Sequence, residues 1–230
     1  ALGADQQGDE LRALLTERGI RVDETLSDGR TGLAIVPVFS NGRGCYFAAG
    51  ANDAFDAKTL LDGVARVESV SAVLIGYPHL LPSLRGQALG DAIEQIDALV
   101  GVDLNGVQPT HYLGDGVVDA ALYKADIVHA NADEAATLLR WPKGYHCTQL
   151  ARALCDATGA ACVVVTDGSS GAAAAVASDP NRLTRLKWPA NGLAAVASLP
   201  GPPGVAPNAN GAGDAFFAAF VASSALHDAS

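Results

Sequence analysis

The sequence contains no methionine, and its acidic residues far outnumber its basic ones. Its 230 residues include 15 Lys and Arg against 25 Asp and Glu, which gives a formal net charge of −10 at pH 7. Such a surface repels the phosphate backbone of a nucleic acid, so we expect no nucleic-acid partner. ATP is not excluded, because a local nest of backbone N–H groups can hold phosphate without a basic surface.

The chain also lacks long apolar segments. It has no run of about 18 apolar residues, the length that a membrane-spanning helix needs, so we expect no membrane partner. The first residues do not show the basic segment and apolar block of a secretory signal, and this favours a cytoplasmic location. The missing methionine and the start at Ala1 together favour a trimmed chain.

Cysteine pairs of the C-x-x-C type are absent as well. The four cysteines are Cys45, Cys147, Cys155 and Cys162. Their spacing favours reduced cysteines, some of them in the core, with disulfides or a zinc site as the alternatives. None of the five histidines is spaced with another as a metal-binding pair, so we expect no metal ligand among them.

What is present indicates a globular α/β chain. Hydrophobic residues make up 49% and charged residues 17%, and the length allows one sizeable core, so we expect one domain over residues 1–230. Strands are expected at residues 72–76, 99–104, 126–129, 162–166 and 172–177. Helices are expected at residues 9–18, from 59, and at 84–99, 117–124, 133–139, 147–158 and 211–223. This alternation predicts a mostly parallel sheet, which binds ligands at the carboxyl ends of its strands.

An antiparallel ribbon is expected before the first buried strand. Residues 31–38 alternate loosely and are rich in β-branched side chains, and residues 45–48 would form the returning strand. Asn41 and Gly42 between them are a strong hairpin signal. An apolar ribbon face needs cover, so the segment at about residues 31–49 predicts a homodimer.

The strongest chemical signal lies in residues 208–217. Gly211, Ala212 and Gly213 lack bulky side chains, so a ligand can approach their backbone closely. They stand at the expected start of a helix, where the first N–H groups are unpaired and the dipole is positive. These residues predict an anion hole that suits the charge on a transferred phosphoryl group. Asp214 beside it either accepts a proton from an attacking hydroxyl or only complements the helix dipole.

Several segments, in order along nearly the whole chain, resemble motifs of the ribokinase-like (PfkB-type) carbohydrate kinase family. They are the "G-x-D-x-x-G" helix in 3–19, the lid hairpin in 31–52, the D-x-N strand end in 102–105, the N-x-x-E motif in 131–134, the nucleotide segment in 163–171 and the C-terminal signature in 211–216. The resemblance implies a three-layer α/β ribokinase-like fold with a mostly parallel central sheet and a small β lid at about 31–49. It also implies that the N- and C-terminal parts of the family pattern are missing.

The resemblance implies ATP-dependent transfer of the γ-phosphoryl group to a hydroxyl of a sugar or a related small molecule, with Mg²⁺ as cofactor. Asp214 would be the catalytic base, and residues 211–213 would form the anion hole. Asn131 and Glu134 would act at the metal–phosphate end of the site. Glu134 would work through water, because Mg²⁺ keeps several of its waters.

Further residues are assigned by the same resemblance. The residues implied to line the nucleotide are Thr166, Gly168, Ser169 and Gly171. An ordinary turn after a strand is the alternative for them. Asp103 and Asn105 would contact the substrate or hold a loop. Arg43 would reach from the lid toward the substrate, or it is a solvated surface arginine.

The signature of the family usually opens with Asp-Thr, where this chain has Asn208 and Ala209. An Asp there helps to bind a cation, so the use of a monovalent cation is in doubt. A trimmed kinase and a divergent relative both account for the missing parts. We favour the trimmed chain, because loss of a parallel strand would expose a long apolar edge.

Other functions are considered beside the sugar kinase. Asn208 and Ala209 motivate the first alternative, a catalytically weakened kinase-like protein that binds or acts as a scaffold. A nucleoside is the alternative substrate. A dinucleotide-binding oxidoreductase is disfavoured, because no G-x-G-x-x-G follows the first strand.

Overall fold

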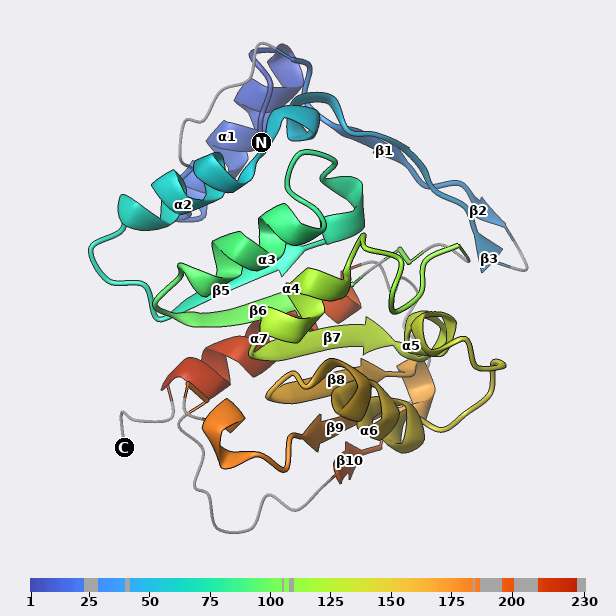
Figure 1. Cartoon of the computed structure of the whole chain (residues 1–230). Coiled ribbons are helices and arrows are strands. Elements are labelled where there is room, and N and C mark those ends of the chain that lie inside the picture. The colour runs from blue at the N-terminus through green and yellow to red at the C-terminus, as the bar shows by residue number, and fades with distance from the viewer. Residues whose placement is uncertain are drawn as a thin grey trace.

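The computed structural model describes residues 1–22, 29–39, 42–104, 106–107, 110–183, 185–186, 196–200 and 211–226. Its centre is a six-stranded sheet in the order β10-β9-β8-β7-β6-β5 (Figure 1). The strands are β5 (Ala72–Gly76), β6 (Leu99–Asp103), β7 (Ile127–Asn131), β8 (Cys162–Thr166), β9 (Ala172–Val176) and β10 (Val196–Leu199). Strands β5 to β8 pair in parallel, whereas β9 and β10 are antiparallel to their neighbours. The expected mostly parallel sheet is confirmed, and β10 is an addition that the sequence did not predict.

The central strands are apolar on both faces. Every residue of β6 is buried, and in β8 only Thr166 at the carboxyl end is partly exposed. Continuous apolar runs of this kind form strands that are covered by helices on both sides. The sheet therefore ends in polar residues only where the strands reach its carboxyl edge.

Helices cover the two faces of the sheet and complete three layers. The helices of the described residues are α1 (Gln6–Glu17), α2 (Ala57–Ala65), α3 (Gln87–Glu94), α4 (Asp119–Lys124), α5 (Ala132–Leu139), α6 (Cys147–Thr158) and α7 (Ala212–Leu226). Helices α3 to α6 lie on one face, and α7 lies on the other (Figure 1). On the α7 face, Phe217 and Val221 pack with Leu99, Ile127 and Val164 in one buried cluster. The expected three-layer fold is confirmed.

Most of the expected helices have somewhat different bounds in the structure, and the largest difference is in the third one. The helix expected at 84–99 is α3, which begins only at Gln87 and ends at Glu94. Gly86 before it has φ 68°, a left-handed conformation that interrupts a helix. Leu84 and Ile96 are nevertheless buried. The apolar pattern over residues 84–99 therefore predicted which residues are buried, but not how long the helix is. The last helix extends to Leu226 instead of 223.

The antiparallel ribbon expected at 31–49 is confirmed in two pieces. Strand β1 (Leu33–Ile35) pairs with β4 (Tyr46–Ala48), and β2 (Val38–Phe39) pairs with β3 (Gly42–Arg43). The hairpin turn at Asn41 lies outside the described residues. The ribbon projects from the rest of the molecule (Figure 1), and Leu33, Ile35 and Tyr46 are 57%, 57% and 72% exposed.

Asp5 fastens the first strand of the ribbon to helix α1. Its Oδ1 accepts hydrogen bonds from Gly8 N–H (2.9 Å) and the Thr31 hydroxyl (2.6 Å), and its Oδ2 accepts from Thr31 N–H (2.8 Å). The hydrogen bonds from Thr31 hold the pKa of Asp5 below its ordinary value. A Cβ at Gly8 would lie 2.2 Å from the carbonyl oxygen of Gly3, so both glycines of the G-x-D-x-x-G motif are needed for close approach.

The returning strand of the ribbon is held at the same place. Ala51 N–H donates to the carbonyl oxygen of Arg30 at 2.7 Å. Gly50 before it has φ 55°, and a Cβ there would lie 2.3 Å from that same oxygen. The two ends of the ribbon are therefore joined to each other, and Asp5 joins the first of them to the start of α1.

The four cysteines are free thiols. Cys45 is exposed, and the other three are buried. Burial raises the pKa of the Cys155 thiol to about 11 and also raises that of Cys162. In the part of the chain that the structure describes, no helix combines the length and the apolar character needed to cross a membrane.

Candidate functional site

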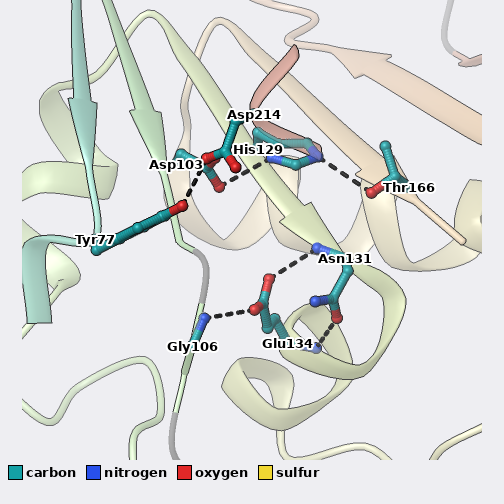
Figure 2. A network of polar contacts seen from close by, with 8 residues as sticks. All are labelled: Tyr77, Asp103, Gly106, His129, Asn131, Glu134, Thr166 and Asp214. Atoms are coloured by element: carbon teal, nitrogen blue, oxygen red, sulfur yellow. Dashed lines mark hydrogen bonds and ion pairs between the residues drawn. The ribbon is translucent and has the colours of Figure 1, made fainter. Parts of the chain in front are cut away.

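Polar side chains gather at the carboxyl edge of the parallel strands, beneath the start of α7 (Figure 2). They come from five different segments of the chain. The residues drawn in the figure are Tyr77, Asp103, Gly106, His129, Asn131, Glu134, Thr166 and Asp214. Because α/β sheets bind ligands at this edge, we take this network as the centre of the candidate site.

The start of α7 has the local structure that the sequence predicted. Gly211 has φ 77°, a left-handed conformation that favours glycine, and its carbonyl oxygen accepts the helical bond from Ala215 N–H at 2.9 Å. Ala212 begins the helix, and Gly213 lies so close to His129 that a Cβ there would be 3.5 Å from Cε1 of the ring. The first N–H groups of a helix have no partner within it, so this turn can accept an anion.

Asp214 stands in the first turn of α7 and is exposed. Its Oδ1 accepts a hydrogen bond from the Tyr77 hydroxyl at 2.6 Å (Figure 2). Its Oδ2 lies on the side of Gly211, where a Cβ would be 4.0 Å away. A carboxylate oxygen therefore faces the backbone of the candidate anion hole.

Tyr77 was not predicted from the sequence. It directly follows β5 and adopts φ 56° and ψ 53°, a left-handed conformation that is uncommon for a bulky residue. Pro78 comes next, and a proline further disfavours helical dihedrals in the residue before it. A backbone of this kind costs about 1–3 kcal/mol. The N–H of Tyr77 donates to the carbonyl oxygen of Asp103 at 2.9 Å, which fixes the residue beside β6.

His129 joins the ends of two other strands. Its Nδ1 lies 2.9 Å from Asp103 Oδ1, and its Nε2 lies 3.1 Å from the Thr166 hydroxyl (Figure 2). An ionised carboxylate only accepts hydrogen bonds, so Nδ1 carries a hydrogen in this pair. The ring stacks on Phe217 of α7, with centroids 5.3 Å apart and planes 17° from parallel. His129 thus connects the candidate substrate residue Asp103, the candidate nucleotide residue Thr166 and the helix that carries Asp214.

Sequence reasoning also missed His129, although a signal for it existed. Ile127 and Val164 pack in the apolar cluster on the α7 face of the sheet. Alternate residues of a strand point to the same face, so His129 and Thr166 had to face α7 as well. In β7 and in β8, the residues that face α7 are apolar at the start of the strand and polar toward its carboxyl end, where His129 and Thr166 belong to the site.

Asn131 and Glu134 form a capping box at the start of α5. Asn131 Oδ1 accepts from Glu134 N–H, and Glu134 Oε2 accepts from Asn131 N–H, both at 2.9 Å. Glu134 Oε1 accepts a third bond, from Gly106 N–H at 2.7 Å. Burial raises the pKa of the Glu134 carboxyl, and the two backbone N–H groups act against that shift. Both carboxylate oxygens are thus occupied by backbone donors.

A cavity of about 550 Å³ lies beside this capping box, within the size range of small-molecule sites. It is lined by Val107, Asn131, Ala132, Asp133, Glu134, Thr137, Lys143, Thr166, Asp167 and Gly168. Four of the residues expected at the nucleotide and metal end therefore share one cavity. Ser169 and Gly171 belong to the same turn, η3 (Gly168–Ser170) and the residue after it, but do not line the cavity.

The donors at this cavity fit a Mg²⁺ ion only through water and substrate oxygens. Glu134 offers oxygen atoms, the ligand type that Mg²⁺ prefers, but both already accept backbone hydrogen bonds. Asp133 is paired with Lys143 at 2.5 Å. Among the described residues, no group of three or more His, Cys, Asp or Glu side chains could hold a metal ion. An ion that keeps its waters and binds phosphate oxygens suits this donor set.

The remaining expected residues cannot be placed in the site. Asn105, Asn208 and Ala209 lie outside the described residues. The backbone of Arg43 belongs to β3, but its side chain also lies outside what the structure describes.

Comparison with known proteins gives one family and one fold. A family model described as pfkB family carbohydrate kinase matches residues 1–228. No curated protein matches the chain. The fold is similar to that of a ribokinase from Thermotoga maritima, with a TM-score of 0.71 and 17% identity over 97% of this chain and 66% of that one. The chain therefore spans about two thirds of the length of that structure.

Two further solved structures give the same result. A ribokinase from Arabidopsis thaliana, complexed with ribose and ATP, has a TM-score of 0.70 and 22% identity over 97% of this chain and 67% of that one. Phosphofructokinase-2 from Escherichia coli, in complex with fructose-6-phosphate, has a TM-score of 0.67 and 19% identity over 98% and 68%. At these identities the similarity establishes the fold.

Proposed function

Because the chain belongs to the pfkB family of carbohydrate kinases, we propose that it serves ATP-dependent transfer of the γ-phosphoryl group to a hydroxyl of a sugar or related small molecule. One observation carries this proposal. Asp214 stands in the first turn of α7 with one carboxylate oxygen toward Gly211, at the carboxyl edge of the parallel strands. A proton acceptor and an anion-binding turn are thereby adjacent.

The geometry supports a direct displacement. The acceptor hydroxyl donates its hydrogen bond to Asp214 Oδ2. As its oxygen attacks the γ-phosphorus, the proton passes to the carboxylate, and the bond between the γ-phosphorus and the bridging oxygen of ADP breaks. Charge on the phosphoryl oxygens develops beside the N–H groups of residues 211–213, which are fixed before the reaction begins.

The nucleotide is proposed to lie along the cavity beside α5. Thr166 and Gly168 would contact it directly, with Ser169 and Gly171 in the adjoining turn. Asn131 and Glu134 would hold a Mg²⁺ ion through water. When bound, that ion neutralises charge on the phosphate oxygens. Asn208 stands where the family usually has Asp, and the loss of that charge is expected to weaken any use of a monovalent cation.

The acceptor is proposed to bind near Asp103 and Asn105, with Arg43 approaching from the ribbon. A sugar is favoured over a nucleoside, because the family is one of carbohydrate kinases. The Arabidopsis structure contains ribose and the Escherichia coli structure fructose-6-phosphate, so these two compounds are the first to assay. We further propose that residues 1–230 form one domain, in which the ribbon at about 31–49 is the lid and the contact surface of a homodimer.

The substitution Asp214→Asn tests the assigned base. The variant is expected to bind ATP nearly as well as the parent and to lose about 10²- to 10⁴-fold in kcat. Asp156→Asn is the matched control, because Asp156 is an exposed aspartate on α6 paired only with Arg152 among the described ion pairs. Near-normal turnover by Asp214→Asn would show that another group accepts the proton.

A weakened kinase-like protein that binds or acts as a scaffold is the second candidate, motivated by Asn208 and Ala209. A panel of sugars and nucleosides assayed with ATP and Mg²⁺ separates the two functions. Robust turnover of any acceptor removes this candidate. Activity that arises only in the variant Asn208→Asp supports it.

A further inference from the structure

Two independent features of Tyr77 point to a role that the family motifs do not describe. Its hydroxyl donates to Asp214, and its backbone is held in an unfavourable conformation. We propose that Tyr77 is a positioning residue, whose hydroxyl holds Oδ1 of Asp214 so that Oδ2 faces the acceptor hydroxyl. This inference rests on the proposed function, in which Asp214 is the base.

The hydrogen bond joins two distant parts of the chain. Tyr77 and Asp214 are 137 positions apart, and their oxygen atoms are 2.6 Å apart. This distance is typical of a hydroxyl that donates to an ionised carboxylate, one of the stronger kinds of hydrogen bond. Asp214 is exposed, so packing alone does not select one of its rotamers. The hydrogen bond from the Tyr77 hydroxyl selects one rotamer of Asp214 instead.

The two oxygens of Asp214 have different surroundings. Oδ1 is occupied by Tyr77, whereas Oδ2 lies toward Gly211 at the start of α7. A base for phosphoryl transfer must direct a lone pair at the hydrogen of the acceptor hydroxyl while the transferred group lies at the anion hole. Because Tyr77 holds Oδ1, the oxygen left to face the acceptor hydroxyl is Oδ2, which lies nearer to residues 211–213.

The left-handed backbone of Tyr77 stands between β5 and the short turn η2 (Pro78–Leu80), where its carbonyl oxygen accepts from Leu80 N–H at 2.8 Å. Tyr77 and Arg140 are the non-glycine residues with positive φ in the described part of the chain. Arg140 ends α5 as a left-handed cap, which is a common way for a helix to stop. Tyr77 instead follows a strand, is only half-buried, and directs its phenol at Asp214 (Figure 2). Non-glycine residues held in a left-handed conformation are concentrated at functional positions.

A first experiment measures turnover with MgATP and with D-ribose or fructose 6-phosphate, whichever reacts faster. Tyr77→Phe keeps the ring and removes only the hydroxyl. It is expected to lower kcat about 10- to 100-fold, as for other residues that orient a reacting group, while KM for ATP and the unfolding midpoint stay unchanged. In the Asp214→Asn background, the same substitution is expected to cause no further loss, because the two residues act as one unit.

Tyr123→Phe is the matched control. Tyr123 is an exposed tyrosine of α4 whose hydrogen bond from Arg182 involves its backbone carbonyl oxygen, so loss of its hydroxyl should leave kcat unchanged. Unchanged or higher kcat in Tyr77→Phe would overturn the proposal. Higher kcat would mean that the phenol blocks Asp214 instead of orienting it.

A second experiment needs no acceptor and no turnover. In the full chain labelled with [ζ-¹³C]tyrosine, the resonance of Tyr77 is identified by its loss in Tyr77→Phe. Asp214→Asn is expected to shift this resonance, and Asp156→Asn is expected not to. If Asp214→Asn leaves it in place, the contact is absent and the proposal is wrong. A clear shift without turnover of any acceptor would instead leave the contact established and count against the proposed function.

Discussion

His129 Nδ1 lies 2.9 Å from Asp103 Oδ1, and both side chains are buried beneath the first turns of α7. The pair stands between the candidate acceptor end and the candidate nucleotide end, because Nε2 of the same ring contacts the Thr166 hydroxyl. One imidazole therefore sets the relative positions of three strand ends. Removal of the His129 side chain should mainly lower the free energy of unfolding, and to a lesser extent change the geometry of the site.

The double-mutant cycle of His129→Leu and Asp103→Leu measures this pair. His129→Leu alone should lower the free energy of unfolding by about 1–3 kcal/mol, because the Asp103 carboxylate and the Thr166 hydroxyl each lose a hydrogen-bond partner in a buried place. The double variant should lose less than the sum of the two single changes, since it leaves no buried charge behind. Urea unfolding at pH 7 gives the four free energies. Additive losses would mean that the two side chains do not interact.

The position of the Glu134 carboxylate in the capping box leads to a separate prediction about the binding of Mg²⁺. Glu134→Gln keeps the size of the side chain but removes the charge and one of two acceptor oxygens. We expect the affinity for Mg²⁺ in the presence of a non-hydrolysable ATP analogue to fall about 10- to 100-fold, the usual effect of losing a group that orients metal-bound water. Isothermal titration with and without Mg²⁺ measures the change.

Glu94→Gln is the control for that titration. Glu94 is an exposed glutamate of α3 that pairs with Lys124 on α4. Its loss should leave Mg²⁺ and nucleotide binding as in the parent chain. Equal affinities in Glu134→Gln and Glu94→Gln would remove Glu134 from the metal–phosphate end of the site.

His79 in the turn after β5 gives the protein a predicted response to acid. Neither ring nitrogen has a hydrogen-bond partner among the described residues, and the ring meets His111 edge-on with centroids 5.5 Å apart. Burial lowers the pKa of His79 to about 4, and the charges of His111 and Arg85 act in the same direction. The charged form of His79 is thus disfavoured in the fold and normal in the unfolded chain.

The sign of the effect follows from this depressed pKa. Between pH 6.5, where the unfolded histidine titrates, and about pH 4, the unfolded state binds one more proton. The free energy of unfolding should therefore fall with decreasing pH across this window, by at most about 1.4 kcal/mol per pH unit from this group. His79→Leu should be at least as stable at pH 7 and should lack this component. Parallel slopes for parent and variant in urea unfolding would contradict the assignment.

The exposed ribbon predicts a concentration-dependent dimer. Ile35→Lys places a charge on the apolar ribbon and should weaken the dimer at least about tenfold, because burial of one large aliphatic side chain contributes about 1.5–3 kcal/mol. Leu11→Lys is the matched control, since Leu11 is also an exposed aliphatic residue but lies on α1. Light scattering over a concentration series measures both. A monomer at all concentrations in the parent chain would contradict the proposed homodimer.

Elements with a complete local signal were predicted from the sequence. The bounds of β5, β8 and α6 are those expected, because each is an apolar pattern that ends at a residue with its own conformational preference, as at Gly159 after α6. Strand β10 was missed, since it is an edge strand whose Leu199 is exposed and whose place depends on pairing with β9. Pairing of that kind is decided by the tertiary structure and not by the segment itself.

Some residues of the candidate site could be predicted from local sequence, and others depend on the tertiary structure. The glycines and Asp214 at the start of α7 were predicted, because a helix start follows from local sequence. Alternation along β7 would also have brought His129 to the α7 face. Tyr77 could not be predicted, since left-handed backbone before a proline is what a tyrosine ordinarily avoids. Its hydroxyl reaches Asp214 only because the surrounding structure enforces that conformation.

The fixed base of the ribbon decides which part of it can change position. Asp5 holds Thr31 at the start of α1, and Ala51 N–H donates to Arg30, so the two ends of the ribbon are joined to each other beside α1. The ladder is interrupted farther out, between the β1–β4 and β2–β3 pairs, where Pro37 has no N–H to donate and accepts from Gly44 N–H at 3.0 Å. Bending is therefore expected at this joint. A bend at this joint would change the position of the β2–β3 pair, the part of the ribbon to which Arg43 belongs.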